Sequence, residues 1–158
     1  MHSIIPMDDI EKFVNEIRQN RGEIKIVFTN GIFDIIHRGH ITYLEKAKDY
    51  GDILILGLNS DSSAKRLKGS DRPIVNQDDR AYILSRMEPV DIVSIFNEDT
   101  PINLIRKVKP DILIKGGDYE LEGIVGREFV ESYGGIVNTI PFVEGKSTSG
   151  LIEKIRKL

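Results

Sequence analysis

Short apolar runs alternate along the chain with segments whose apolar residues recur every three or four positions. The runs rich in β-branched residues predict five strands, at 24–28, 53–58, 91–96, 111–115 and 135–140. Helical spacing predicts helices over 8–20, 40–50, 60–67, 77–87, 100–109, 125–133 and 147–158. Strands separated by helices pair in parallel through right-handed crossovers. The pattern therefore predicts one domain over residues 1–158, a three-layer α/β sandwich around a five-stranded parallel sheet.

The residues that directly follow each strand are where a ligand is expected. In open parallel sheets, ligands bind beyond the carboxyl ends of the strands, where the strand order reverses. In this chain those positions are 29–40, 59–61, 97–100, 115–119 and 141–149. Four of these five segments contain residues suited to binding an anion or a nucleotide, so the search for function starts there.

The segment after the first strand, 29–40, reads Thr-Asn-Gly-Ile-Phe-Asp-Ile-Ile-His-Arg-Gly-His. Gly31 and Gly39 have no side chain, so another molecule can approach the backbone closely at these points. The helix that begins near His40 presents free amide groups and the positive end of its dipole, which together suit an anion. An anion there would favour the protonated forms of His37 and His40, which could then donate to phosphate oxygens.

A metal site is the first alternative for the two histidines, and a simple helix cap is the second. The chain has no cysteine, and its third histidine is His2, so a zinc site would depend on carboxylates. The Gly-x-Gly-x-x-Gly dinucleotide fingerprint does not occur in this segment either, which disfavours a nicotinamide cofactor. We therefore expect no metal ion held by the protein alone.

Two later segments add candidate ligand contacts. Gly116 and Gly117 follow the fourth strand and let backbone groups face a flat ligand, while Asp118 can accept a hydrogen bond from a base amine, a hydroxyl group or a coordinated metal. The hydroxyl residues 147–149 stand at the start of the last predicted helix, and three in succession exceed what one N-cap needs. A plain turn and a plain cap remain the alternatives.

The charge is unevenly distributed along the chain. The 22 basic and 25 acidic residues give a net charge of −3, yet residues 65–86 carry six basic and three acidic side chains, a balance of +3 that leaves −6 elsewhere. Lys68, Arg72 and Arg80 in this stretch are the residues favoured to neutralise a polyphosphate, with a solvated loop as the alternative.

The overall composition excludes several classes of protein. A mildly acidic chain, with a pI near 5.7, is atypical of a general nucleic-acid binder. No apolar run approaches the 18 or so residues of a membrane span, and residues 1–6 are too short for a secretory signal. We expect a cytoplasmic protein that binds neither nucleic acid nor membrane.

Residues 31–40 resemble the signature Gly-x-Phe-Asp-x-x-His-x-Gly-His of the cytidylyltransferase-like nucleotidyltransferase superfamily. From about Lys25 onward the chain is similar to the D-glycero-D-manno-heptose 1-phosphate adenylyltransferases, the branch that makes ADP-heptose for the lipopolysaccharide core. The supporting stretches are 27–31, 58–61, 66–69, 115–119 and 142–145 with the hydroxyls after them. The resemblance implies a Rossmann-like fold of the HxGH nucleotidyltransferase type. It also implies a homodimer and, because no kinase portion is present in these 158 residues, a standalone form.

The resemblance implies transfer of AMP from ATP to a sugar 1-phosphate, with Mg²⁺ accompanying ATP. The catalytic roles then belong to His37, His40, Lys68 and Arg80. Nucleotide contacts are expected from Thr29, Asn30, Gly31, Phe33, Gly39, Lys115, Gly117, Asp118, Ser147, Thr148 and Ser149. Asp34, Asn59 and Arg72 are expected to contact the sugar phosphate, with a position near Mg²⁺ as the alternative for Asp34.

Two other functions remain open. The glycerol-phosphate and choline-phosphate cytidylyltransferases share the first motif, but they typically carry Arg-Thr-x-Gly where this chain has Phe-Val-Glu-Gly at 142–145. That departure removes an arginine from the phosphate site, for which Lys68 or Arg80 would compensate. The second possibility is a regulatory nucleotide-binding module, or a receiver-like domain in which Asp34 accepts a phosphoryl group.

Overall fold

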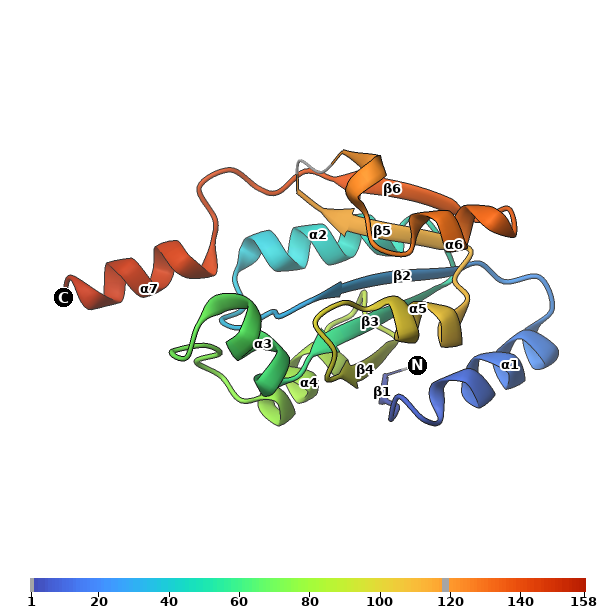
Figure 1. Cartoon of the computed structure of the whole chain (residues 1–158), viewed down its shortest axis with the longest axis horizontal. Helices are drawn as coiled ribbons and strands as arrows, with labels where there is room; N and C mark the ends of the chain where they lie inside the picture. The colour runs from blue at the N-terminus through green and yellow to red at the C-terminus, as the bar shows by residue number, and fades with distance from the viewer. Residues whose placement is uncertain (1, 118–119) are drawn as a thin grey trace.

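A six-stranded parallel sheet forms the centre of the part of the chain that the computed structural model describes, residues 2–117 and 120–158 (Figure 1). Every pairing in the sheet is parallel. In spatial order the strands are β1 (Ser3–Ile4), β4 (Ile92–Phe96), β3 (Ile53–Asn59), β2 (Ile26–Gly31), β5 (Ile112–Gly116) and β6 (Ile136–Ile140). The predicted α/β class and the five predicted strands are confirmed, but the predicted number of strands is wrong by one.

The strand missing from the prediction is β1, which lies at the edge of the sheet. Ser3 pairs with Ile92 and Ile4 with Val93. The amide of Ser3 donates to the carbonyl of Asp91, and the amide of Ile5 donates to that of Val93. Two residues are too few for a periodicity to be seen in sequence, so only the pairing with β4 makes this segment a strand.

Helices cover both faces of the sheet. The first face carries α1 (Ile10–Arg21), α5 (Ile102–Val108) and α6 (Arg127–Ser132), whose apolar side chains pack with Ile26, Phe28 and Ile55. The second face carries α2 (Arg38–Lys48) and α4 (Gln77–Ser85), which pack with Val27, Leu54 and Leu56. Alternate residues of each strand thus enter two separate apolar clusters, which confirms the three layers.

The remaining helices lie at the ends of the strands. They are α3 (Asp61–Lys68), a short 3₁₀ helix η1 (Leu121–Gly123) and α7 (Thr148–Arg156). Ser60, Asn76 and Ser147 cap their helices, because each side chain accepts a hydrogen bond from an amide three residues further on. The helix predicted over 100–109 is α5, whose cap position is Pro101, and no side chain caps it.

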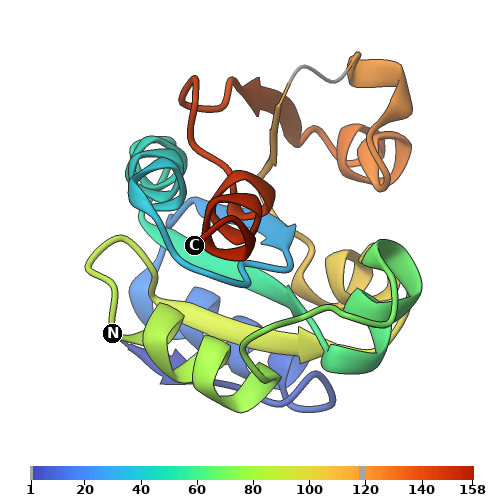
Figure 2. The same cartoon turned by 90° about the vertical axis from the view of Figure 1, so that its left-hand side faces the viewer.

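The strand order reverses beside β2. The chain runs from β2 outward through β3 to β4, and then returns to place β5 and β6 on the other side of β2. Loops that leave β2 and β5 in opposite directions open a crevice beyond the carboxyl ends of these strands. Figure 2 views the molecule from this end, with α7 in front of β2. No helix in residues 2–117 or 120–158 is long and apolar enough to cross a membrane.

Candidate active site

A cavity of about 600 Å³ opens at the carboxyl ends of β2, β3 and β5. Its walls are made by the segment that follows β2, by Lys68 and Arg72, by residues 99–101 after β4, by Lys115 and Gly116, by residues 123–125, and by 142–143 and 146–149. The volume falls in the range of sites that hold a small ligand or cofactor. The position agrees with the one predicted from the strand ends.

His37 and His40 lie at the start of α2 and both line this cavity. His37 is the N-cap residue, and its Nδ1 accepts a hydrogen bond of 3.1 Å from the amide of Gly39. The proton of neutral His37 is therefore on Nε2, which is left to donate. The two imidazole rings are stacked, with centroids 3.9 Å apart and an interplanar angle of 24°. His37 is thus a cap and a cavity residue at once.

The environment of the histidine pair favours the neutral imidazoles. Burial, together with the nearby charge of His37, lowers the pKa of His40 to about 4. Burial also lowers the pKa of His37, as does the charge of Lys146. Nδ1 of His40 is buried without a hydrogen-bond partner among the described residues. Protonation of this pair would therefore depend on a bound anion.

The free energy of unfolding should fall as the pH is lowered from about 6.5 to about 4. The unfolded chain binds a proton at His40 near pH 6.5, whereas the folded protein resists protonation down to about 4, so acid favours the unfolded state in this window. Because the ring is partly exposed, we expect a contribution on the order of 1–2 kcal/mol.

This contribution can be measured by urea unfolding of the wild type and His40→Gln at pH 7, 5.5 and 4.5. The variant should lose less stability than the wild type across the range, because its neutral amide binds no proton. Equal losses in the two proteins would show that His40 is not the source.

Gly31 and Gly39 make room for aromatic rings of the site itself. A Cβ on Gly31 would lie 2.7 Å from Cε2 of Phe33, and one on Gly39 would lie 2.9 Å from Cε1 of His37. Phe33 is buried with a φ of 47°, a conformation that costs a non-glycine residue free energy, and its ring centroid lies 5.1 Å from that of His40. The prediction that these glycines admit a ligand is thus corrected in part, because side chains of the motif occupy the space.

Four cationic side chains surround the histidines: Lys68, Arg72, Lys115 and Lys146 all line the cavity. Burial lowers the pKa of Lys115, and the charge of Lys68 lowers it further. Two acidic residues also line the cavity, and each is paired with an arginine. Sequence reasoning missed Lys146, whose only signal is its place between Gly145 and the capping serine. Such a wall suits a ligand with several negative charges.

Most of the predicted site residues line the cavity. They are Asn30, Gly31, Phe33, Asp34, His37, Gly39, His40, Asn59, Lys68, Arg72, Lys115, Ser147, Thr148 and Ser149. Three others, Thr29, Arg80 and Gly117, do not line it. Asp118 lies outside the described residues.

Thr29 and Gly117 support the site from behind. Thr29 is fully buried, and its Oγ1 lies 2.5 Å from the hydroxyl of Tyr43, which does line the cavity. Gly117 has a φ of 108°, and its amide donates to the carbonyl of Ile140. Gly116 faces the cavity in its place. The predicted nucleotide contacts of Thr29 and Gly117 are therefore corrected to supporting roles.

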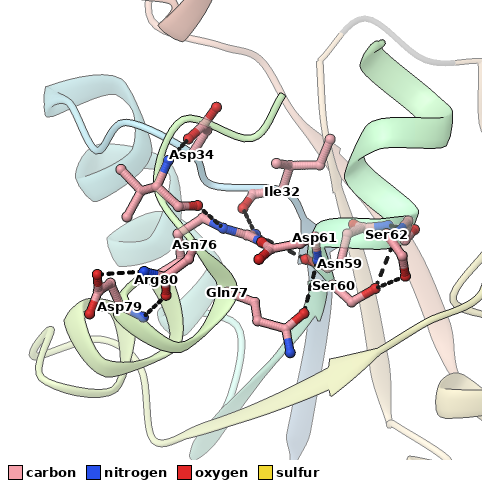
Figure 3. Close-up of polar contacts among 12 residues, drawn as sticks. Ile32, Asp34, Asn59, Ser60, Asp61, Ser62, Asn76, Gln77, Asp79 and Arg80 are labelled. Atoms are coloured by element: carbon pink, nitrogen blue, oxygen red, sulfur yellow. Dashed lines mark hydrogen bonds and ion pairs between the residues drawn. The ribbon is translucent and has the colours of Figure 1, made fainter. Parts of the chain in front are cut away.

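Arg80 is buried inside the protein and does not reach the cavity. Its side chain is fully inaccessible, and each of its nitrogens donates to the protein (Figure 3). Nε donates to the carbonyl of Val75 at 2.9 Å, Nη1 to those of Ile32 at 2.6 Å and Asn59 at 2.9 Å, and Nη2 to Oδ1 of Asp61 at 2.8 Å. The predicted direct contact of Arg80 with polyphosphate is thus wrong in this structure, because its donors face inward.

Asp34 is 3% exposed and already has three protein donors. Its carboxylate accepts from Nε of Arg72 at 2.7 Å, from the amide of Ile74 at 2.9 Å and from that of Val75 at 2.8 Å. Burial alone would raise the pKa of Asp34, but these hydrogen bonds outweigh it and lower the pKa. A phosphoryl acceptor needs a reachable carboxylate, so the receiver-like alternative finds no support.

The donor set of the described residues does not fit a metal held by the protein. Within residues 2–117 and 120–158, no three His, Asp or Glu side chains come together in a group that could hold a metal ion. The carboxylate of Asp34, for which a position near Mg²⁺ was the alternative, is paired with Arg72.

The three hydroxyl residues at the start of α7 divide into two kinds. Ser147 accepts from the amide of Gly150 at 3.0 Å, and Oγ1 of Thr148 donates to the carbonyl of Ile35 at 3.2 Å. Ser149 is exposed at the cavity. The amide end of α7 therefore faces the same cavity as that of α2, which brings two such ends toward one ligand.

Comparison with known protein families matches residues 28–150 to a family described as cytidylyltransferase-like. The chain belongs to the cytidylyltransferase-like family. The match runs from β2 into α7 and so includes all the predicted site residues. The structure places all six fixed positions of the family signature at the cavity: Gly31, Phe33, Asp34, His37, Gly39 and His40.

Relatives of this cytidylyltransferase-like chain include two proteins named bifunctional protein HldE. The one from Geobacter sulfurreducens is 56% identical over 133 residues, which cover 84% of this chain and 27% of the relative. The one from Campylobacter concisus is 52% identical over 155 residues, which cover 98% of this chain and 31% of the relative. The chain thus spans less than a third of the length of these relatives.

Solved structures agree with the fold. The lipopolysaccharide core biosynthesis protein from Thermoplasma volcanium has a TM-score of 0.63 and 28% identity, covering 78% of this chain and 100% of that one. The pantoate-beta-alanine ligase from Francisella tularensis has a TM-score of 0.61 at 16% identity, over 100% of this chain and 79% of that one. The second likeness supports the fold alone.

Proposed function

We propose that this chain is an adenylyltransferase that joins the AMP moiety of ATP to a heptose 1-phosphate and releases pyrophosphate. The observation that carries the proposal is the stacked pair His37 and His40, which shares one cavity with Lys68, Lys115 and Lys146. A cavity with this lining suits two phosphorylated substrates. The sequence resemblance supplies the heptose and the adenine, and the HldE relatives support that choice.

The proposed reaction is an in-line displacement at the α-phosphorus of ATP. An oxygen of the sugar phosphate forms the new bond, and the bond from the α-phosphorus to the bridging oxygen breaks, so that pyrophosphate leaves with the electron pair. The attacking oxygen is already an anion, so no protein nucleophile is needed. The enzyme mainly aligns two phosphates that repel each other and neutralises the charge that builds on the leaving group.

The residues of the cavity suit these tasks. Nε2 of His37 and the ring of His40 would donate to the β- and γ-phosphates above the amide end of α2. Lys68 and Lys115 would offset the charge of the leaving pyrophosphate, and Arg72 would offer its terminal nitrogens to a phosphate. Mg²⁺ carried in by ATP is a prediction of this proposal, and no protein group is assigned to hold it.

The test is to combine ATP or CTP with heptose 1-phosphate or glycerol 3-phosphate, and to follow pyrophosphate release and product mass. Pyrophosphate release should be fastest with ATP and heptose 1-phosphate, and the product of that pair should have the mass of ADP-heptose. A preference for CTP with glycerol 3-phosphate would establish a cytidylyltransferase instead. Binding of ATP without turnover on any acceptor would indicate a regulatory module. The homodimer and the cytoplasmic location stay predictions.

A further inference from the structure

The segment 69–76, which connects α3 with α4, brings a cation into the cavity without secondary structure to hold it. Arg72 is at its middle and lines the cavity. Within residues 69–76 the backbone makes one hydrogen bond to itself, from the amide of Arg72 to the carbonyl of Gly69. Other groups must therefore hold the loop in place.

Two buried side chains of opposite charge hold this segment from its two sides. The carboxylate of Asp34 accepts from the amides of Ile74 and Val75, while Nε of Arg80 donates to the carbonyl of Val75. Residue Val75 thus has both its backbone polar groups bound by a charged side chain. Hydrogen bonds to charged groups are the strong ones, and here both charges are shielded from water.

The same two side chains connect the segment to the rest of the site. Arg80 donates to the carbonyl of Ile32, which belongs to the signature segment 31–40, here called the histidine motif. It also donates to the carbonyl of Asn59, at the end of β3 (Figure 3). Asp34 belongs to the histidine motif and binds Nε of Arg72. One guanidinium and one carboxylate therefore hold the motif, the end of β3 and the loop in a single arrangement.

The arrangement leaves part of Arg72 available to a ligand. Its Nε is bound to Asp34, and its side chain is 16% exposed. Its two terminal nitrogens have no hydrogen-bond partner among residues 2–117 and 120–158. A planar fork oriented through its Nε is well suited to bind two phosphate oxygens at once. Its orientation is set by Asp34, because that ion pair determines the direction of the guanidinium plane.

We propose that Asp34 and Arg80 are paired positioning residues that clamp residues 72–75 so that Arg72 points into the phosphate cavity. We call this arrangement the 72–75 clamp. In it, Asp34 contacts neither a metal ion nor the sugar phosphate, and Arg80 contacts no phosphate. The kinetic consequences rest on the proposed function, whereas the structural consequences do not.

Amide hydrogen exchange tests the clamp without any reaction. In Asp34→Asn, the amides of Ile74 and Val75 should exchange about tenfold faster or more, because the variant replaces an acceptor oxygen with an amide donor. Exchange in β3 should stay unchanged, which reports that the protein is folded. Unchanged protection of both amides would overturn the clamp, even if the wild type proved to have no transferase activity.

A double-mutant cycle tests whether Asp34 acts through Arg72. Asp34→Asn and Arg72→Met should each lower kcat/KM by about 100-fold, and the double variant should lose little more than one of them. Losses that multiply would show that Asp34 has a contact of its own with substrate or metal. The Mg²⁺ concentration at half-maximal rate should be equal in Asp34→Asn and the wild type, and a tenfold increase would also overturn the proposal.

Chemical rescue tests Arg80. Arg80→Ala should lose most of its activity. Added guanidinium ion should raise the kcat/KM of this variant at least tenfold, because removal of the side chain leaves a buried space that matches the ion in shape. Should Arg80→Ala fail to fold, Arg80→Lys is the substitute, with accelerated exchange at Ile74 as its readout. The control is Arg86→Met, since Arg86 is exposed near the end of the same helix. Failure of rescue in folded protein, or unchanged exchange in Arg80→Lys, would overturn the role of Arg80.

Discussion

His40→Ala should lower kcat by about 1,000-fold, which corresponds to about 4 kcal/mol of transition-state stabilisation. The ring of His40, at the start of α2, contacts the rings of both Phe33 and His37, and this packing restricts its orientation. A donor already oriented toward the phosphates needs no reorganisation as charge builds on the leaving group. The measurement is steady-state pyrophosphate release with saturating substrates.

The control for this prediction is His2→Ala. His2 is exposed and contacts the carbonyl of Val90 through Nδ1, away from the histidine pair. It should keep wild-type turnover. Circular dichroism would report whether His40→Ala is folded, and near wild-type kcat from the folded variant would remove His40 from the mechanism.

Lys115→Met should lower kcat/KM by about 100-fold or more. Lys115 is the last residue but one of β5, so its backbone is fixed by the sheet, and its side chain is half-buried on the cavity wall. Burial and Lys68 lower the pKa of Lys115, which means that keeping Lys115 charged costs free energy when no ligand is bound. A bound polyphosphate relieves that cost, so we expect Lys115 to interact more strongly with the transition state than an exposed lysine does.

Two comparisons make this prediction sharper. Lys12→Met changes an exposed lysine on α1 and should leave kcat/KM unchanged. Lys68→Met should raise the pKa of Lys115, which can be followed by NMR titration of the labelled lysine. An unchanged pKa would show that the two ammonium groups do not interact, and wild-type kcat/KM for Lys115→Met would show that this lysine faces no phosphate.

The extent of successful prediction differs between kinds of residue. His37 and His40 could be placed from sequence because they belong to one short segment between a strand and a helix, where spacing alone determines the geometry. Arg80 was predicted to face the ligand because it belongs to the positively charged stretch 65–86, and Asp34 because it belongs to the signature 31–40. Their actual partners, Val75 and Arg72 among them, lie on another segment, and nothing in local spacing indicates a buried ion-paired arrangement.

The sequence by itself determined the layers, five of the six strands and the end of the sheet at which the site lies, because hydrophobic periodicity is a local property that follows from the helical and strand repeats. Only the tertiary structure decided which polar groups face the cavity. Thr29 and Arg80 turned inward and β1 became a strand, each through a partner more than ten residues away, and Lys146 joined the cavity wall. Side chains are oriented by the groups that satisfy their hydrogen bonds and charges, and those groups become neighbours only when the chain folds.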